Sequence, residues 1–456
     1  MAATASTAVA AVLAAAGKTH KTAIALIPPR SVWAPLQEVR CFNDKSFVRW
    51  PPHVNLLYPF LDSQHFPAAA QAAAEALRSF KPFQVTLCEP SFFEHGRSCT
   101  LWLCPGSPSG ELLAVQAALE RAFPHCTDLS SDSGRGITAF TPHLSLGQWR
   151  TRADVEAAAA QLAAGWSPLS FEVAGVGLIA RQGFEDPFRL EWFVPLDGGE
   201  PVAVGAPYIA TVGDSACSPA PAGEGNAGSN SSGDARWRAF FGIGAEQEDG
   251  SVWQFAYGAN MCPRKLNGAR GLHPLESLPA SLPGWRLAFT HRGGMGNLVQ
   301  LAPGEPGPAG LGAVHGVLHR LSAADYGRLC CMEHEYRPVE VAVQPYGSDA
   351  PVPAVAFVSP QERLIADGLP PPQRYLQLLQ EGSTHWQLDP VYTAWLGGLQ
   401  GVDTRGDAYY TGATSGQPLA AWPKIRTGSQ PQRGGQQGRR RQGQQRRGRQ
   451  GQPGGQ

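Results

Sequence analysis

Two histidines in the first half of the chain lie in matching five-residue motifs. Residues 52–56 read Pro-His-Val-Asn-Leu and residues 142–146 read Pro-His-Leu-Ser-Leu, so the two histidines are 90 positions apart in the same context. Side chains point alternately to the two faces of a β-strand. We therefore predict that each histidine and the polar residue two positions later share one face, while the apolar residues enter a core.

A pair of facing histidines suits phosphodiester chemistry. A neutral imidazole can take a proton from water or a ribose hydroxyl, and a protonated one can donate a proton to the leaving oxygen. His53 and His143 are the candidate catalytic residues, and Asn55 and Ser145 are candidates to bind the phosphate oxygens. The sequence does not assign which histidine is the acid and which the base. The alternative is two structural strand histidines, and the repetition of the whole motif argues against it.

A second candidate site follows later in the chain, where a strand-like segment runs into a tight turn. Residues 252–261 read VWQFAYGANM, and glycine and asparagine accept the backbone angles that such turns require. Successive amides in a turn of this kind can bind an anion. The candidate substrate-binding residues here are Phe255, Ala256, Tyr257, Gly258, Ala259 and Asn260.

The histidine motifs give residues 22–196 a resemblance to the 2H phosphoesterases, the 2′-5′ RNA ligase-like or cyclic phosphodiesterase superfamily defined by two His-x-Thr/Ser motifs. The resemblance implies a two-lobed α+β fold that acts on 2′,3′-cyclic phosphates or 2′-5′ linkages of RNA or nucleotides. It implies His53 and His143 as the catalytic pair, with no metal or cofactor. Asn55 departs from the family, which usually has a hydroxyl there.

Residues 251–402 resemble the gamma-glutamylcyclotransferase-like family in the turn, in the strand-like run at 312–321 (GAVHGVLHRL) and in a glutamate before a tyrosine. The resemblance implies that the α-amine of a γ-glutamyl peptide or amine attacks its own side-chain amide and releases 5-oxoproline. Glu333 is the implied proton shuttle, with Glu335 as the alternative registration, and Tyr336 is implied to bind substrate. Ala259 departs from the family, which usually has serine.

The predicted fold class is α+β, with two independent domains: a duplicated, two-lobed 2H phosphoesterase-like domain and a gamma-glutamylcyclotransferase-like mixed α/β barrel. The predicted segments are a disordered Ala-rich N-terminus (1–21), the first domain (22–198), a flexible linker (199–250), the second domain (251–402) and a disordered Gln/Gly/Arg-rich tail (403–456). Strands are expected at 22–27, 83–87, 100–103 and 189–196, and helices at 68–80, 111–123 and 373–379.

Composition restricts the remaining possibilities. Apolar residues make up 43% of the 456 positions, enough for real cores, and no apolar run is long enough for a membrane span. Nine cysteines without a Cys-x-x-Cys pair favour a reducing compartment over a disulfide framework or a zinc site. We expect a cytoplasmic protein; a nuclear address from the arginine run at 439–441 and a plastid address from the acid-free N-terminus stay open.

The tail concentrates positive charge. Residues 424–456 hold nine basic residues and no acid, whereas the rest of the chain holds 28 basic and 37 acidic residues. Arginines among glycine and glutamine suit loose, non-specific RNA binding, and the alternative is a solubilising extension. The sequence thus predicts a bifunctional enzyme, and the competing hypothesis is a non-catalytic RNA-interaction protein with two degenerate domains.

Overall fold

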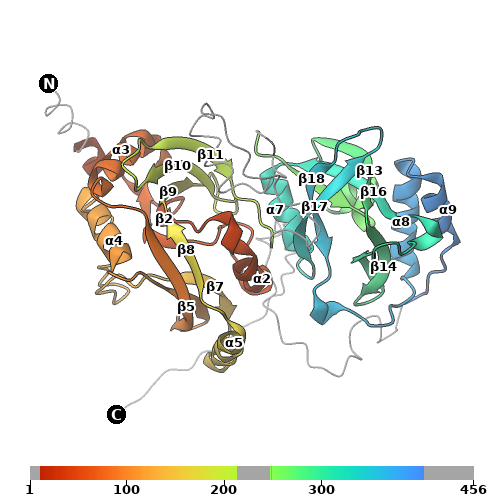
Figure 1. The fold of residues 1–456 in the computed structure, drawn as a ribbon, viewed down its shortest axis with the longest axis horizontal. Coiled ribbons are helices and arrows are strands. Elements are labelled where there is room, and N and C mark those ends of the chain that lie inside the picture. Colours follow the sequence, from red (N-terminus) through yellow and green to blue (C-terminus); the bar gives the residue numbers. More distant parts are fainter. Residues whose placement is uncertain (1–10, 213–246, 248, 405–456) are drawn as a thin grey trace, which may run out of the picture. The chain divides into compact units, whose positions relative to one another are not determined.

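The computed structural model describes residues 11–212, 247 and 249–404, all of which belong to one compact unit, Met1–Lys424. Helices and several separate sheets alternate along these residues (Figure 1), which confirms the predicted α+β multidomain class. Residues 1–10, the predicted linker from 213 onward, apart from residues 247 and 249–250, and nearly all of the predicted tail lie outside the described residues. The predicted disordered N-terminus is wrong over residues 11–21, where 11–15 are helical, 18–19 pair as a strand and Leu13 is buried in the core. None of the helices in the described ranges is long and apolar enough to cross a membrane.

The N-terminal lobe contains two antiparallel sheets. The first has the order β11-β10-β9-β2-β3 and the second the order β7-β6-β5-β8. Their bounds are β2 (Thr22–Leu26), β3 (Val54–Leu57), β5 (Phe83–Glu94), β6 (Cys99–Gly106), β7 (Leu144–Trp149), β8 (Leu169–Val173), β9 (Gly175–Ala180), β10 (Arg189–Pro195) and β11 (Val202–Pro207), and a short ladder pairs β1 (Lys18–Thr19) with β4 (Phe60–Leu61). Each histidine motif therefore enters a strand, β3 or β7, at the edge of a different sheet.

Four helices pack on these sheets: α2 (Trp33–Asn43), α3 (Phe66–Leu77), α4 (Glu111–Ala122) and α5 (Arg152–Gly165). The alanine-rich α3 buries Phe66, Ala69, Ala70, Ala73 and Leu77, the spacing of one helical face. The predicted helices at 68–80 and 111–123 are confirmed to within three residues at each end. The sequence analysis did not predict α2 or α5.

A glycine lets α2 approach the second sheet. A Cβ on Gly147, in β7, would lie 2.6 Å from the Cβ of Asn43, the last residue of α2. No real Cβ contact is that short, so any other residue would push the helix and the strand apart. Because β7 contains the last three residues of the second histidine motif, this contact helps fix where that motif lies.

The predicted linker is wrong at its start. Residues 202–207 form β11, which pairs with β10 in the register Leu190↔Ala206 and Phe193↔Val202. The segment continues as a buried run, in which the Tyr208 hydroxyl donates to the carbonyl of Phe47 at 2.7 Å. The carbonyl of Ala210 accepts a hydrogen bond of 2.7 Å from the hydroxyl of Tyr326, which belongs to the C-terminal lobe. The glycine- and proline-rich context concealed a strand whose valines and alanine face the core.

The C-terminal lobe is built on a closed barrel in the order β12-β16-β13-β17-β18, as the predicted mixed barrel requires. Its strands are β12 (Val252–Ala256), β13 (Glu276–Pro283), β16 (Ala313–Leu321), β17 (Arg337–Pro345) and β18 (Val352–Val358), and a hairpin pairs β14 (Trp285–His291) with β15 (Met295–Gln300). Strands β12 and β18 run parallel, and the other pairs are antiparallel. The helical segments of its described residues are η3 (Ala259–Met261), η4 (Arg264–Ala269), η5 (Pro308–Gly310), α7 (Ala323–Met332), η6 (Gln361–Arg363), α8 (Gln373–His385) and α9 (Pro390–Gly398).

Candidate active sites

The first histidine is held in one tautomer by its neighbours. His53 immediately precedes β3, and its Nδ1 lies 2.8 Å from the carbonyl oxygen of Pro51. A carbonyl can only accept, so Nδ1 carries the hydrogen. Nε2 lies 3.1 Å from the amide nitrogen of Asn55 and, in the neutral ring, accepts its hydrogen bond. The imidazole also stacks on Trp50, with ring centroids 4.5 Å apart.

His53 is electrostatically suited to be a base. Burial lowers its pKa to about 4, and the positive charges of Arg40 and of a protonated His143 act in the same direction. Arg40 forms a buried ion pair of 2.7 Å with Asp44 and also donates to the carbonyl of Trp50 at 2.9 Å. The ring is therefore neutral at pH 7, and a buried polar network supports the indole on which it stacks.

The second histidine repeats this geometry. His143 immediately precedes β7, and its Nδ1 lies 2.8 Å from the carbonyl oxygen of Thr141, again two residues earlier. Its ring meets Phe93 edge-on at a centroid distance of 5.0 Å. Burial lowers the pKa of His143 as well, with His95 acting in the same direction. In both copies Nδ1 is occupied by a backbone carbonyl, which leaves Nε2 as the nitrogen for proton transfer.

The predicted alternation of faces is confirmed in both motifs. Val54, Leu56, Leu144 and Leu146 are fully buried, whereas the two histidines, Asn55 and Ser145 are only partly buried. The two histidine sites are close enough for one imidazole to influence the pKa of the other. The four predicted side chains thus lie on the polar faces of two strands from different sheets.

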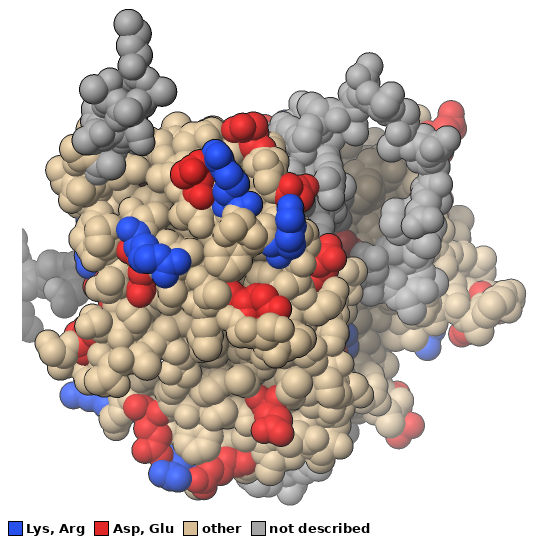
Figure 2. Space-filling model, turned by 60° about the vertical axis from the view of Figure 1, so that its left-hand side comes forward, with Lys and Arg blue, Asp and Glu red and all other residues tan. Residues whose placement is uncertain are grey.

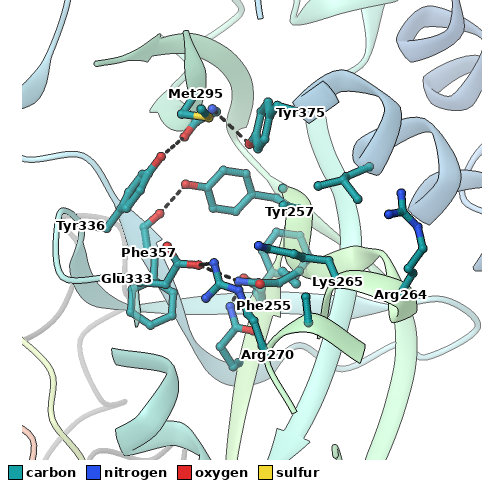
Figure 3. A pocket seen from close by; sticks show the side chains of 18 of the residues that line it. Phe255, Tyr257, Arg264, Lys265, Arg270, Met295, Glu333, Tyr336, Phe357 and Tyr375 are labelled. Carbon is teal, nitrogen blue, oxygen red and sulfur yellow. Dashed lines mark hydrogen bonds and ion pairs between the residues drawn. The ribbon is translucent and has the colours of Figure 1, made fainter. Parts of the chain in front are cut away.

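The second site is a cavity of about 660 Å³ in the C-terminal lobe (Figure 3). It is enclosed by the end of β12, by η3 and η4, by β15, by the end of α7 and by α8. All eight residues predicted for this site line it: Phe255, Ala256, Tyr257, Gly258, Ala259, Asn260, Glu333 and Tyr336. The barrel therefore brings the turn and the glutamate, which are 73 positions apart, to one place.

Glu333 is the acidic residue of this lining. It directly follows α7, and its Oε1 accepts a hydrogen bond of 2.9 Å from the side-chain amide of Asn260. The same oxygen lies 2.7 Å from Nη2 of Arg270, and both side chains of this ion pair are largely buried. Figure 3 shows the carboxylate between the turn after β12 and the guanidinium. Sequence analysis did not identify Arg270.

Three tyrosines line one wall of the cavity. Tyr257 donates to the carbonyl of Phe357, and Tyr336 donates to the carbonyl of Gly296 at 3.0 Å. The hydroxyl oxygen of Tyr375 accepts from the amide of Gly296 at 3.1 Å. Burial raises the pKa of all three phenols, so they stay neutral.

Three buried polar atoms of the lining have no hydrogen-bond partner within the described part of the chain: Oε1 of Gln254, Oδ1 of Asn260 and Nη1 of Arg270. Buried polar atoms are almost always satisfied, so these three atoms of one cavity are available to a ligand or to water. Two are acceptors, which suit an ammonium group. The third is a cationic donor, which suits a carboxylate.

Glu335 lies outside the cavity lining, in a separate charged cluster. It pairs with Arg292 and lies 3.5 Å from Nε2 of His291 and 3.9 Å from Nη1 of Arg363. The hydrogen bond with His291, followed by the charges of the two arginines, lowers the pKa of Glu335 to about 2. Of the two registrations considered from the sequence, the structure places Glu333 in the cavity and Glu335 behind its wall.

Comparison with known proteins gives a family match within the N-terminal lobe. Residues 28–185 match the family model of the 2′-5′ RNA ligase superfamily. The 2′-5′ RNA ligase match includes both histidine motifs, so the resemblance stated from the sequence is confirmed. No curated protein matches the chain in sequence.

Several solved structures are similar to parts of the chain. An uncharacterized protein from Homo sapiens shares 19% identity over 34% of this chain and 90% of its own, with a TM-score of 0.28. A gamma-glutamyl cyclotransferase shares 18% identity over 34% and 90%, with a TM-score of 0.28. LigT from E. coli, solved with 3′-AMP, shares 16% identity over 40% and 97%, with a TM-score of 0.27.

The residues that sequence analysis missed come from distant segments. In the 2′-5′ RNA ligase-like lobe these are Trp50 and the Arg40–Asp44 pair behind it. In the cavity they are Gln254, Arg270 and Tyr375, and Tyr375 lies on α8, more than a hundred residues after β12. Only Trp50 carried a usable signal, because an aromatic residue three positions before a catalytic histidine is placed to pack on it.

Proposed function

We propose that the N-terminal lobe is a phosphodiesterase that acts on 2′,3′-cyclic phosphates or 2′-5′ linkages of RNA or nucleotides. The observation that carries the proposal is the matched pair of histidines, each with Nδ1 bound to the carbonyl two residues earlier and each leading into the edge strand of a different sheet. The family match over residues 28–185 supports the same chemistry.

The low pKa of His53 supports a role for it as the base. A water molecule would give its proton to Nε2 of His53 as it attacks phosphorus, after the Asn55 amide turns from that nitrogen toward a phosphate oxygen. His143, protonated, would donate from Nε2 to the ribose oxygen as the P–O bond breaks. Asn55 and Ser145 would donate hydrogen bonds to the phosphate oxygens. The Asn55 amide would thus take the place of the hydroxyl that the family usually has at this position.

The test is hydrolysis of a 2′,3′-cyclic nucleotide in the presence of a chelator. His53→Ala and His143→Ala should each reduce turnover at least ~10²-fold, since each proton transfer contributes about that factor. His65→Ala, a half-exposed histidine outside the site, is the matched control and should retain full turnover. Turnover that survives in both single variants would contradict the mechanism. Wild-type binding of cyclic-phosphate RNA ends without turnover would favour the non-catalytic RNA-interaction alternative.

We propose that the C-terminal lobe is a γ-glutamyl cyclotransferase. The observation that carries this proposal is the cavity in which Glu333 meets two unsatisfied acceptors and an unsatisfied guanidinium nitrogen. That set complements the free α-amino-acid end of a γ-glutamyl compound, which presents one ammonium and one carboxylate. The predicted turn and tyrosine lie on the same lining, which supports the same reaction class.

The reaction follows from this placement. The substrate carboxylate would form an ion pair with Arg270. Oδ1 of Asn260 and Oε1 of Gln254 would accept hydrogen bonds from the substrate ammonium. Glu333, released from Arg270, would remove a proton from the ammonium, and the amine would attack the side-chain carbonyl carbon to close the five-membered ring. The amides of Ala259 and Asn260 would stabilise the oxyanion. As the C–N bond breaks, Glu333 would return its proton to the leaving amine.

The test is release of 5-oxoproline from γ-glutamyl-alanine, followed by mass spectrometry. Arg270→Met should raise KM roughly tenfold or more, because a hydrogen bond to a charged group contributes at least about that factor. Arg328→Met, an exposed arginine of α7 paired with Asp325, is the control and should change neither constant. No 5-oxoproline from any γ-glutamyl amino acid, γ-glutamylamine or glutathione would refute the proposal.

A further inference from the structure

The cavity of the C-terminal lobe is lined by an excess of cations. Its charged lining residues are Arg264, Lys265, Arg270, Arg374 and Glu333. Arg270 is paired with Glu333. Arg264 is paired at 2.9 Å with Glu381, which is outside the lining. Lys265 and Arg374 have no ion-pair partner among the described residues, so two positive charges remain available to a ligand.

These two cations come from different elements. Lys265 belongs to η4 and is half-buried, and in Figure 3 its side chain extends across the cavity in the direction of Arg270. Arg374 is the second residue of α8 and is exposed, which places it at the cavity mouth. Gln377 and Leu378, one turn later on α8, also line the cavity, so Arg374 lies on the helix face that borders it.

The γ-glutamyl end of a substrate uses neither cation. Its carboxylate and ammonium are satisfied by Arg270, Asn260 and Gln254, as argued above. A cavity of about 660 Å³ is the size that encloses most of a drug-sized ligand, so a γ-glutamyl group fills only part of it. The leaving-group half of the substrate therefore lies beside Lys265 and Arg374, and a neutral alkylamine there would leave both charges unpaired.

We propose that Lys265 and Arg374 form an anion subsite for carboxylates on the leaving group. The preferred substrates are then γ-glutamyl peptides whose leaving group is an acidic amino acid, with γ-glutamyl-glutamate as the simplest, and γ-glutamylamines are the poorest. This inference rests on the proposed cyclotransferase function. It follows from charge complementarity, because each added carboxylate meets a cation that has no ion-pair partner in the described part of the chain.

The experiment compares three substrates whose leaving groups carry no carboxylate, one and two: γ-glutamyl-butylamine, γ-glutamyl-alanine and γ-glutamyl-glutamate. In the wild type, kcat/KM for 5-oxoproline release should rise along this series, by roughly tenfold or more from the amine to the glutamate. Lys265→Met and Arg374→Met should each reduce the preference for γ-glutamyl-glutamate over the amine several-fold. Arg328→Met should keep the wild-type preference, and added salt should weaken it.

Calorimetric titration with γ-glutamyl-glutamate and γ-glutamyl-butylamine separates the subsite from the reaction. Tighter binding of the glutamate compound that is lost in Lys265→Met and Arg374→Met supports the subsite, even if no 5-oxoproline forms and the cyclotransferase proposal fails. Equal affinity for the two compounds in the wild type overturns the subsite. A preference that both variants retain also overturns it.

Discussion

Glu333→Gln tests whether the cavity needs a carboxylate or only a residue of that shape. In the wild type one oxygen of Glu333 receives the Asn260 amide at 2.9 Å and lies 2.7 Å from Nη2 of Arg270. The glutamine carbonyl can keep the contact with Arg270. Because one oxygen makes both contacts, the same carbonyl can also keep the hydrogen bond from the Asn260 amide. The substitution therefore removes the charge and the proton acceptor while the local geometry is kept.

The magnitudes of the two effects differ. Losing the charge opposite a largely buried Arg270 should cost about 1–3 kcal/mol of unfolding free energy, the contribution of a hydrogen bond to a charged group. Losing the proton shuttle should lower kcat for 5-oxoproline at least ~10²-fold, which is about 2.7 kcal/mol of activation free energy. KM should stay within about threefold, because the groups that bind the substrate carboxylate and ammonium are retained.

Saturation kinetics with γ-glutamyl-alanine and urea unfolding measure the two effects separately. Glu335→Gln is the matched control: it makes the same chemical change two residues away, on the other side of the cavity wall, and should keep kcat within about threefold. A Glu333→Gln enzyme with kcat within tenfold of wild type would refute the carboxylate's role. A larger loss of kcat in Glu335→Gln than in Glu333→Gln would show that Glu335, and not Glu333, is the proton shuttle.

Three further predictions concern other parts of the chain. Cyclic-nucleotide kcat/KM should rise as pH increases through about 4, where His53 loses its proton and becomes neutral. It should fall again at higher pH as His143 loses its proton, and because burial lowers the pKa of His143, the midpoint of this fall should lie below the usual imidazole pKa of ~6.5. A flat profile from pH 4 to 8 would contradict the proposed pair of histidines. Glu335→Gln should lower the unfolding free energy by about 1–2 kcal/mol at pH 6, and by less at pH 3 in urea titrations. The sign follows because a carboxyl whose folded pKa is about 2 stabilises above its unfolded pKa of ~4.3 and loses that contribution as pH falls toward 2; a pH-independent difference would exclude this charge cluster as the cause. Deleting residues 424–456, which lie outside the described residues, should weaken single-stranded RNA binding and its salt dependence without changing cyclic-nucleotide turnover; unchanged affinity at low salt would leave the tail as a solubilising extension.

Sequence patterns predicted what depends on local periodicity. The alternation that buries Val54 and Leu56 and leaves His53 and Asn55 on the polar face follows from the two-residue repeat of a strand, and the structure has it. The turn after β12 was also readable, because glycine and asparagine directly follow the strand-like run, and the strand does end there, at η3. Such features need only neighbouring residues.

The electrostatic environment of the sites could not be predicted in this way. Arg270, Gln254 and Tyr375 meet Glu333 only because the barrel closes, and their own local sequences resemble ordinary surface or core positions. The same holds for the contrast between Glu333 and Glu335. They are two positions apart in the sequence, but Glu333 faces the cavity and Glu335 lies in the charged cluster. Long-range packing decides which charge gains which partner.

Acidic and basic side chains are interspersed on the face of the described residues shown in Figure 2, without an extended area of one sign on that face. A polyanion such as RNA would find no broad electrostatic attraction there.

The pairing of β10 with β11 bears on how the N-terminal lobe can be produced alone. A polypeptide that stops at residue 198, where the sequence suggested the domain ends, lacks β11 and turns β10 into an edge strand. The backbone groups of Leu190 and Phe193 that face Ala206 and Val202 in the intact protein would then be open to pairing with another molecule. Such a fragment should be prone to strand addition at β10, whereas one that extends through Val212 keeps β10 paired and leaves the shorter, glycine-containing β11 as its edge strand.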